Sequence, residues 1–197
     1  MTRFKHSFLV ALVSLVAAWA VDGADTPLAV EPEIGSVVDR YNGVEVVFNG
    51  AISHSAGRNL SADHYNIGIR YQCVEFVKRY YFQKLGHKMP DAYGHAKDFF
   101  DVRVPDGALN PSRGLLQFTN PSATKPQEED IIVLAPTGQN PYGHIAIIAA
   151  VAEDEIEIVQ QNPGPEVPSR VKYPYSQDNG RYQIQNQRVL GYLRKLN

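Results

Sequence analysis

The chain has 197 residues and a formal net charge of −2 at pH 7, from 19 basic and 21 acidic side chains. This balance excludes the strongly basic surface with which proteins bind nucleic acids or anionic membranes. The length fits one domain, and the single cysteine, Cys73, excludes a scaffold held by internal disulfides.

Residues 1–20 have the pattern of a secretory signal peptide. Basic residues precede an apolar run that is too short to span a membrane comfortably, and Ala18-Trp19-Ala20 is a suitable cleavage site. We therefore predict a periplasmic or secreted protein; the alternative is an uncleaved membrane anchor. Residues 21–40 are expected to form an extended lead segment, and residues 41–197 the folded domain.

One strand and a loop are predicted before the cysteine. Residues 41–50 form a short apolar run between two Asn-Gly turn signals, which indicates a strand. Residues 53–65 are polar and predict a loop.

Cys73 opens a predicted amphipathic helix. Apolar side chains at Phe76, Val77 and Tyr80 recur with a helical period, and Gly86 is suited to end the helix. Cys73 thus lies in the first turn, where the helix dipole favours the thiolate and a lowered thiol pKa. A buried, inert thiol is the alternative.

The rest of the chain is predicted to consist mainly of strands. A weaker helix is expected at residues 92–100, and irregular stretches at 102–129 and 162–182. The predicted strands are 130–135, 145–151, 155–161 and 189–194. A helix followed by mainly antiparallel strands is an α+β pattern.

His144 opens the predicted strand 145–151, directly after Gly143. A histidine that the fold brings beside a thiol at a helix N-terminus completes an activated nucleophile. A lone cysteine with a distant histidine is typical of cysteine amidases and peptidases.

Three runs of residues carry a family resemblance. Gln72-Cys73-Val74-Glu75-Phe76, Gly143-His144-Ile145-Ala146 and Gln160-Gln161-Asn162, in this order, resemble the CHAP domain, a cysteine- and histidine-dependent amidohydrolase/peptidase. The first run is most similar to the amidase half of glutathionylspermidine synthetase/amidase. The resemblance covers roughly residues 42–194. It implies a papain-like α+β fold, in which an N-terminal helix with the cysteine packs on an antiparallel sheet with the histidine.

The resemblance also implies roles in the hydrolysis of an amide bond. Cys73 would be the nucleophile and form a thioester, while His144 would take the thiol proton and protonate the leaving amine. The backbone N–H of Cys73 would contribute to an oxyanion hole, with the Gln72 side chain as a candidate second donor.

The third catalytic position departs from the family, which has a Glu-Gln-Asn context where this chain has Gln160-Gln161-Asn162. An amide oxygen can accept the imidazole N–H and set the tautomer, but it carries no charge. We predict that Gln160 orients His144, with Asn162, on the same strand face, as the second choice. A polar strand end without a catalytic role is the alternative.

The remaining polar residues predict no further chemistry. No histidines have metal-ligand spacing and only one cysteine exists, so we expect neither a metal nor another cofactor. Glu75 and Arg79, four positions apart, predict a surface ion pair. We expect a monomer that binds a peptide or peptide-amine substrate, with no nucleic acid and no stable membrane insertion after cleavage.

Together, the signal peptide and the resemblance predict an exported amidohydrolase or endopeptidase that cleaves peptide amides of peptidoglycan. One alternative is a glutathionylspermidine-type amidase, which has the closer motif but a cytosolic substrate. The other is a non-catalytic peptide-binding module with a degenerate triad, which the neutral Gln160 favours and the Cys73/His144 pair disfavours.

Overall fold

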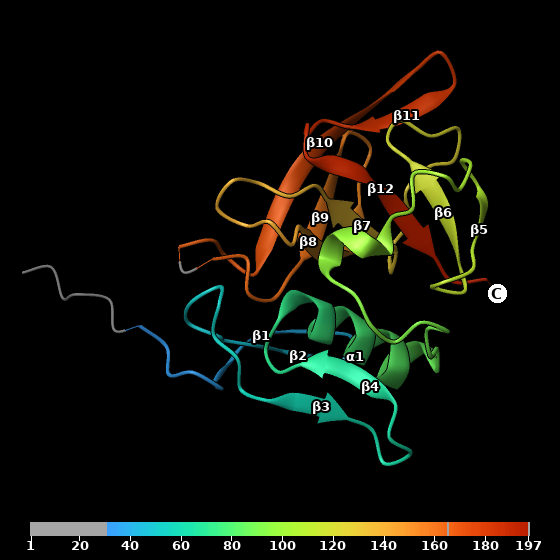
Figure 1. The fold of residues 1–197 in the computed structure, drawn as a ribbon. Helices are drawn as coiled ribbons and strands as arrows, with labels where there is room; N and C mark the ends of the chain where they lie inside the picture. Colours follow the sequence, from blue (N-terminus) through green and yellow to red (C-terminus); the bar gives the residue numbers. More distant parts are fainter. Residues whose placement is uncertain (1–30, 165, 197) are drawn as a thin grey trace, which may run out of the picture. The chain divides into compact units, whose positions relative to one another are not determined.

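The computed structural model describes residues 31–164 and 166–196, which form a mixed α+β fold with one α-helix and a large antiparallel sheet (Figure 1). The predicted signal peptide, residues 1–20, lies outside the described residues. Within the described part, no helix is both long enough and apolar enough to cross a membrane.

The described residues form twelve strands and two helical segments. The strands are β1 (Val37–Tyr41), β2 (Val44–Val47), β3 (Arg58–Leu60), β4 (Asn66–Ile69), β5 (Ala108–Asn110), β6 (Leu115–Thr119), β7 (Ile131–Leu134), β8 (His144–Val151), β9 (Glu155–Val159), β10 (Arg170–Asp178), β11 (Arg181–Ile184) and β12 (Val189–Arg194). The helical segments are α1 (Cys73–Leu85) and the 3-10 helix η1 (Ala96–Phe99).

Two short hairpins precede α1, where the sequence predicted one strand and a loop. Asn42 and Gly43 have φ values of 47° and 85° and form the turn between β1 and β2. An Asn-Gly pair with positive φ at both residues is the preferred turn of a two-residue hairpin, so it joins two strands here instead of ending one. The second hairpin pairs β3 with β4. Because β1 begins at Val37, the fold extends into the predicted lead segment.

The predicted helix is confirmed as α1. Phe76, Val77 and Tyr80 are fully buried on its inward face. Gly86 ends the helix with a φ of 61°, and its N–H bonds to the carbonyl of Tyr81. This left-handed cap suits glycine because glycine has no Cβ. α1 packs against β2 and β4 and against β8 of the large sheet (Figure 1).

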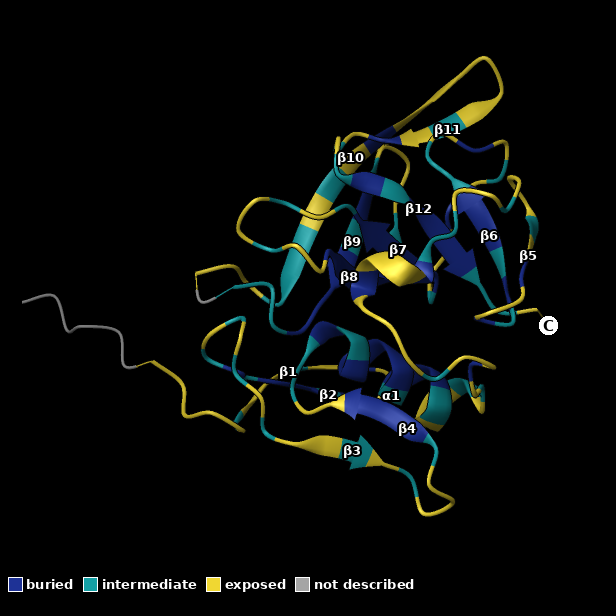
Figure 2. Cartoon of the chain, viewed as in Figure 1, coloured by how far each residue is buried: buried dark blue, intermediate teal, exposed yellow. Residues whose placement is uncertain are grey.

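Eight strands form the large sheet in the order β11-β10-β9-β8-β7-β12-β6-β5. Successive side chains of β8 pack on opposite faces: Ile145 and Ile147 lie in a cluster with the helix, and Ala146 and Ile148 lie in a second cluster. β8 is therefore buried on both faces, as its continuous apolar sequence predicts (Figure 2).

Curling of the sheet covers its second face. Ser122, just after β6, forms an isolated bridge with Tyr182 of β11, so the two ends of the sheet approach each other. Inside this curl, Phe118 stacks on Tyr192 with ring centroids 5.2 Å apart. Aromatic side chains thus complete a second apolar core away from α1.

Several predicted irregular stretches are regular. β5 and β6 lie within residues 102–129, and β10 lies within residues 162–182. In the sequence, Pro174 argues against a strand at β10, because proline is unusual in a central strand. It lies where the pairing of β10 changes from β9 to β11, so its missing N–H costs little. Conversely, the helix predicted at residues 92–100 is only the short η1.

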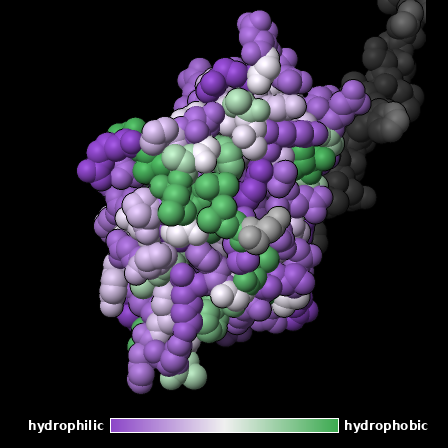
Figure 3. All heavy atoms as spheres, turned by 90° about the vertical axis from the view of Figure 1, so that its right-hand side faces the viewer, coloured by the Kyte–Doolittle hydropathy of each residue, from purple (hydrophilic) through white to green (hydrophobic). Residues whose placement is uncertain are grey.

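Apolar side chains also reach the surface. Figure 3 shows a group of hydrophobic residues in the middle of one face, surrounded by mostly hydrophilic residues. Exposed large apolar side chains among the described residues include Val102, Leu109 and Leu196.

Candidate active site

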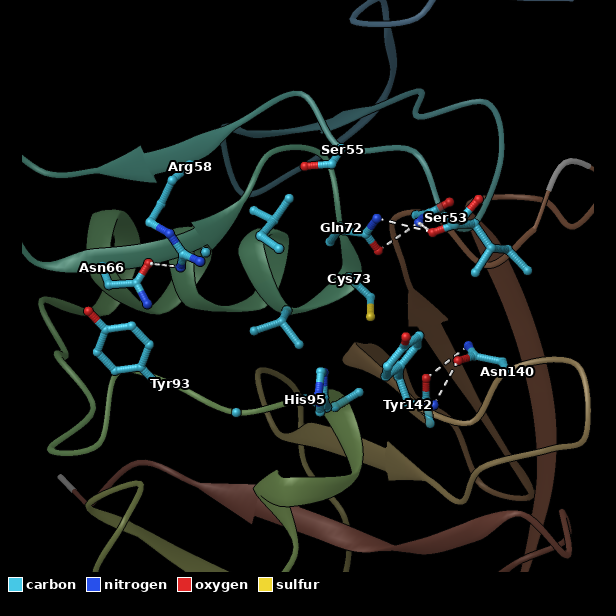
Figure 4. Close-up of a pocket in the computed structure, with 18 of the residues that line it drawn as sticks. Ser53, Ser55, Arg58, Asn66, Gln72, Cys73, Tyr93, His95, Asn140 and Tyr142 are labelled. Carbon is cyan, nitrogen blue, oxygen red and sulfur yellow. Dashed lines mark hydrogen bonds between the residues drawn. The ribbon is translucent and has the colours of Figure 1, made fainter.

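Cys73 lines a pocket with a volume of about 430 Å³. In Figure 4 its sulfur points into the pocket, towards the side on which Tyr142 lies. The pocket takes residues from the segments Ile52–Arg58, Asn66–Ile69, Gln72–Val74, Ala92–Ala96 and Asn140–Gly143, and from Asn162. The first turn of α1 therefore presents the thiol to a space that could hold a substrate.

The thiol lies close to the start of β8. Burial raises the pKa of the Cys73 thiol, while nearby backbone N–H groups of Ile145, Val74 and Cys73 itself oppose this shift. Because the sulfur contacts the backbone N–H of Ile145, it lies beside the residue that follows His144. The lowered thiol pKa predicted from the helix dipole is therefore wrong for this state, because desolvation outweighs the N–H groups.

His144 and Gln160 are brought together, as predicted. His144 Nε2 and Gln160 Oε1 are 2.9 Å apart, and both side chains are buried. Gln160 Nε2 donates to the carbonyl of Pro168 at 2.9 Å, so Oε1 faces the ring and Nε2 of His144 is the donor. Nδ1 is then the basic nitrogen that could accept a thiol proton.

At neutral pH the His144 imidazole and the Cys73 thiol are both uncharged. Burial lowers the pKa of His144 to about 4, with the charge of Arg188 adding to the shift and the bond to Gln160 opposing it. The hydrogen bonds of the described residues include none between the thiol and the imidazole. Catalytic hydrogen bonds are often long in the absence of substrate, so this geometry is compatible with a nucleophile and its base.

Gln72 and Asn162 hold one wall of the pocket. Gln72 Nε2 donates to the carbonyls of Ile52 and His54 at 3.1 and 2.6 Å, so both its N–H groups are engaged. In this structure Gln72 is therefore no free second donor for an oxyanion. Asn162 Nδ2 donates to Gln72 Oε1 at 2.9 Å and to the carbonyl of Ile52 at 3.1 Å. Gln160, and not Asn162, is the partner of His144.

Glu75 and Arg79 form a buried ion pair, so the predicted surface pair is wrong. Glu75 Oε1 accepts from Arg79 Nε at 2.7 Å, and the Glu75 side chain is only 2% exposed. Gln161 Nε2 donates to Glu75 Oε2 at 3.0 Å and to the carbonyl of Gln72 at 3.1 Å. Sequence reasoning missed this link because the partners are 86 positions apart, although Gln161 adjoins the residue that holds His144.

Two buried cations support the opposite wall of the pocket. Lys78 Nζ donates to the carbonyls of Asn66 and Ala92. Arg113 donates to the carbonyls of Asp91 at 2.8 Å and Tyr93 at 3.0 Å. Such charge-assisted bonds fix the backbone of the wall in place of regular secondary structure.

Gly143 lets the turn before His144 pack closely against η1. Its φ is 75°, and an added Cβ would lie 2.8 Å from the carbonyl oxygen of Leu134 and 3.1 Å from the nitrogen of Lys97. The N–H of Lys97 donates to the carbonyl of Tyr142 at 2.9 Å. Glycine is required here because a Cβ would push His144 away from its place.

About half of the chain is similar to parts of known proteins. A stretch of 107 residues is 28% identical to trypanothione synthetase of Crithidia fasciculata and covers 54% of this chain and 16% of that protein. A stretch of 107 residues is 31% identical to the bifunctional glutathionylspermidine synthetase/amidase of Escherichia coli (strain K12), covering 53% and 17%. The match thus spans about one sixth of the length of these curated relatives.

Among solved structures, the crystal structure of Ly7917 is 31% identical over 39% of this chain and 31% of that chain, with a TM-score of 0.28. The family model of the CHAP domain matches residues 63–162, half of the chain, and these residues include Cys73, His144 and Gln160. This match confirms the resemblance predicted from the sequence: the chain belongs to the CHAP domain family.

Proposed function

We propose that the protein is a thiol-dependent amidohydrolase that cleaves peptide amide bonds, with Cys73, His144 and Gln160 as its catalytic group. The observation that carries this proposal is the 2.9 Å hydrogen bond between His144 and Gln160, beside a thiol that opens into a pocket. One relative described above is itself named an amidase, which supports the reaction class.

In the proposed reaction His144 Nδ1 takes the thiol proton, and the sulfur attacks the amide carbon. The backbone N–H of Cys73 stabilises the resulting oxyanion, because the first N–H groups of a helix have no partner within the helix. The intermediate then expels the amine, which takes the proton from the imidazolium, and leaves a thioester. Water deprotonated by His144 hydrolyses the thioester and restores the thiol.

We further propose that residues 1–20 export the protein to the periplasm or the cell exterior, and that it cleaves peptides of peptidoglycan. The export pattern of the sequence supports this location. The pocket supports a peptide substrate, because polar side chains such as Ser53, Ser55 and Asn140 line it beside apolar ones. After residues 1–20 are removed, the mature protein would act as a monomer without a cofactor.

A glutathionylspermidine-type amidase is the second candidate, since the relatives named above favour it. The pocket argues against the polyamine part of that substrate. Among the described residues that line it, Arg58 is cationic and none is aspartate or glutamate. A polyamine would therefore find no opposite charge there.

The proposed function is tested by incubating the purified protein with muropeptides and, separately, with glutathionylspermidine. Mass spectrometry should detect a hydrolysed amide in the muropeptides only. Cys73→Ala and His144→Ala should abolish this product, because they remove the nucleophile and the base. His64→Asn is the matched control, since His64 is exposed and has a φ of 63°, which asparagine tolerates.

Hydrolysis of glutathionylspermidine alone would establish the second candidate in place of the first. Binding of either substrate without hydrolysis, by a protein with an intact thiol, would point to the non-catalytic peptide-binding module. Hydrolysis that persists in Cys73→Ala would contradict the thiol mechanism itself.

A further inference from the structure

One end of the pocket carries the positive charge of an arginine side chain. Arg58 lies there with Asn66 and Tyr93, away from the thiol and from Tyr142 (Figure 4). Within residues 31–164 and 166–196, no carboxylate forms an ion pair with Arg58. Its guanidinium has five N–H donors. Only Nη1 makes a hydrogen bond to a described residue, to Asn66 Oδ1 at 2.9 Å.

The structure holds this guanidinium in position. Asn66 is buried, and its Nδ2 donates to the carbonyl of Ala92 at 2.8 Å, so Oδ1 is turned towards Arg58. The other side of the guanidinium faces the Tyr93 ring, with 5.9 Å between the Arg58 carbon and the ring centroid. An arginine held by an amide and an aromatic ring is pre-organised, so it loses less freedom on binding a ligand.

The surroundings of Arg58 are also cationic. Lys78 and Arg113 are buried below this end of the pocket, where Lys78 Nζ and Arg113 Nη1 donate hydrogen bonds to backbone carbonyls. Asp91 and Asp98 offset part of their charge, but these carboxylates accept the N–H groups of Tyr93 and His95. Neither aspartate lines the pocket. Among the described residues that line the pocket, Arg58 is therefore the one with a formal charge that no carboxylate pairs.

We propose that Arg58, with Asn66 and Tyr93, forms a subsite that binds a carboxylate of the substrate. Guanidinium binds carboxylates through paired N–H···O bonds, and the free donors of Arg58 suit this geometry. The inference rests on the proposed function, and it narrows the substrates to peptides with a free carboxylate several bonds from the scissile amide. It makes Arg58 a specificity residue.

Binding to Cys73→Ala protein tests the subsite without catalysis. The probes are a peptidoglycan stem tetrapeptide and glutathione, each as the free acid and as the fully amidated form, titrated by calorimetry. In the Cys73→Ala background the free acid of at least one pair should bind about tenfold more tightly than its amide. Adding Arg58→Gln should abolish this preference, and Arg58→Lys should restore part of it.

Arg103→Gln is the matched control, because Arg103 is an exposed arginine that does not line the pocket. It should leave the preference for the acid unchanged. Equal affinity for acid and amide, no measurable binding of either form, or a preference that survives Arg58→Gln would each overturn the subsite. If the Cys73→Ala protein prefers the free acid but the parent protein hydrolyses no substrate, only the proposed catalytic function is contradicted.

Discussion

At the scale of single residues, the main departure from the family is that the proposed partner of His144 is the neutral Gln160. Gln160 reaches His144 with its oxygen because its nitrogen is committed to Pro168. This geometry sets the tautomer of the imidazole as a carboxylate would, but it adds no negative charge. Burial then lowers the pKa of His144 to about 4, so the imidazolium needed during turnover is poorly stabilised.

Gln160→Ala should lower kcat/KM by roughly 10- to 1000-fold, since His144, the proposed proton acceptor, loses the hydrogen bond that orients its ring. Gln160→Glu should keep or raise kcat/KM, because a carboxylate stabilises the imidazolium and thereby the thiolate. The acidic limb of its pH profile should move to higher pH, because the carboxylate raises the pKa of His144 from its present value of about 4. Steady-state kinetics on muropeptides between pH 4 and 9 would measure both effects.

A Gln160→Ala enzyme as active as the parent would remove the role from Gln160. Asn162→Ala is then the variant to measure next, because Asn162 lines the pocket and bonds to Gln72, the residue before Cys73. If Gln160→Glu leaves the pH profile unchanged, residue 160 affects His144 only through packing.

At the scale of elements, the site depends on how α1 meets the ends of β8 and β9. The Glu75–Gln161 hydrogen bond joins the first turn of α1 to the chain just after β9. Gln161 Oε1 also accepts the N–H of Val47 in β2 at 2.8 Å. One buried amide thus joins three elements, and it adjoins Gln160. The network therefore links the first turn of α1, which begins at Cys73, to the residue that follows Gln160.

Glu75→Ala should lower the free energy of unfolding by about 2–4 kcal/mol, because it removes the carboxylate that pairs with Arg79 Nε and accepts a hydrogen bond from Gln161 Nε2. Urea unfolding followed by circular dichroism would measure this. Glu45→Ala is the matched control, since the Arg40–Glu45 pair is exposed. It should change stability by less than about 0.5 kcal/mol. A similar small effect of Glu75→Ala would show that the buried network contributes little.

At the scale of the whole molecule, the buried His144 couples stability to pH. The unfolded chain protonates this histidine near pH 6.5, and the folded protein only near pH 4. Between these values the unfolded state binds more protons, so the free energy of unfolding falls as the pH is lowered through this range. The full loss from this group is at most about 3.4 kcal/mol.

His144→Asn should therefore flatten the decline in stability between pH 6.5 and pH 4, whatever its effect at pH 7.5. Urea unfolding at several pH values in this range would show the change in slope. His64→Asn, at an exposed loop position, should keep the slope of the parent. An unchanged slope in His144→Asn would mean that His144 is protonated equally in both states.

Much of the chain could be predicted from the sequence, because the relevant signals are local. The apolar period and Gly86 define α1, and continuous or alternating apolar runs define β7, β8, β9 and β12. The positions of Cys73 and His144 at the starts of their elements follow from the same patterns. Membership of the CHAP family was readable from short runs around these two residues.

Tertiary structure alone decided what depends on distant partners. Pro174 is tolerated because β9 pairs with the first half of β10 and β11 with the second. Glu75 is buried with Gln161, which lies 86 positions away in the sequence. The direction of the Cys73 pKa shift followed from burial, which neighbouring residues in the sequence do not reveal. Local periodicity and turn chemistry act over a few residues, whereas desolvation and buried hydrogen bonds arise only when separate segments pack together.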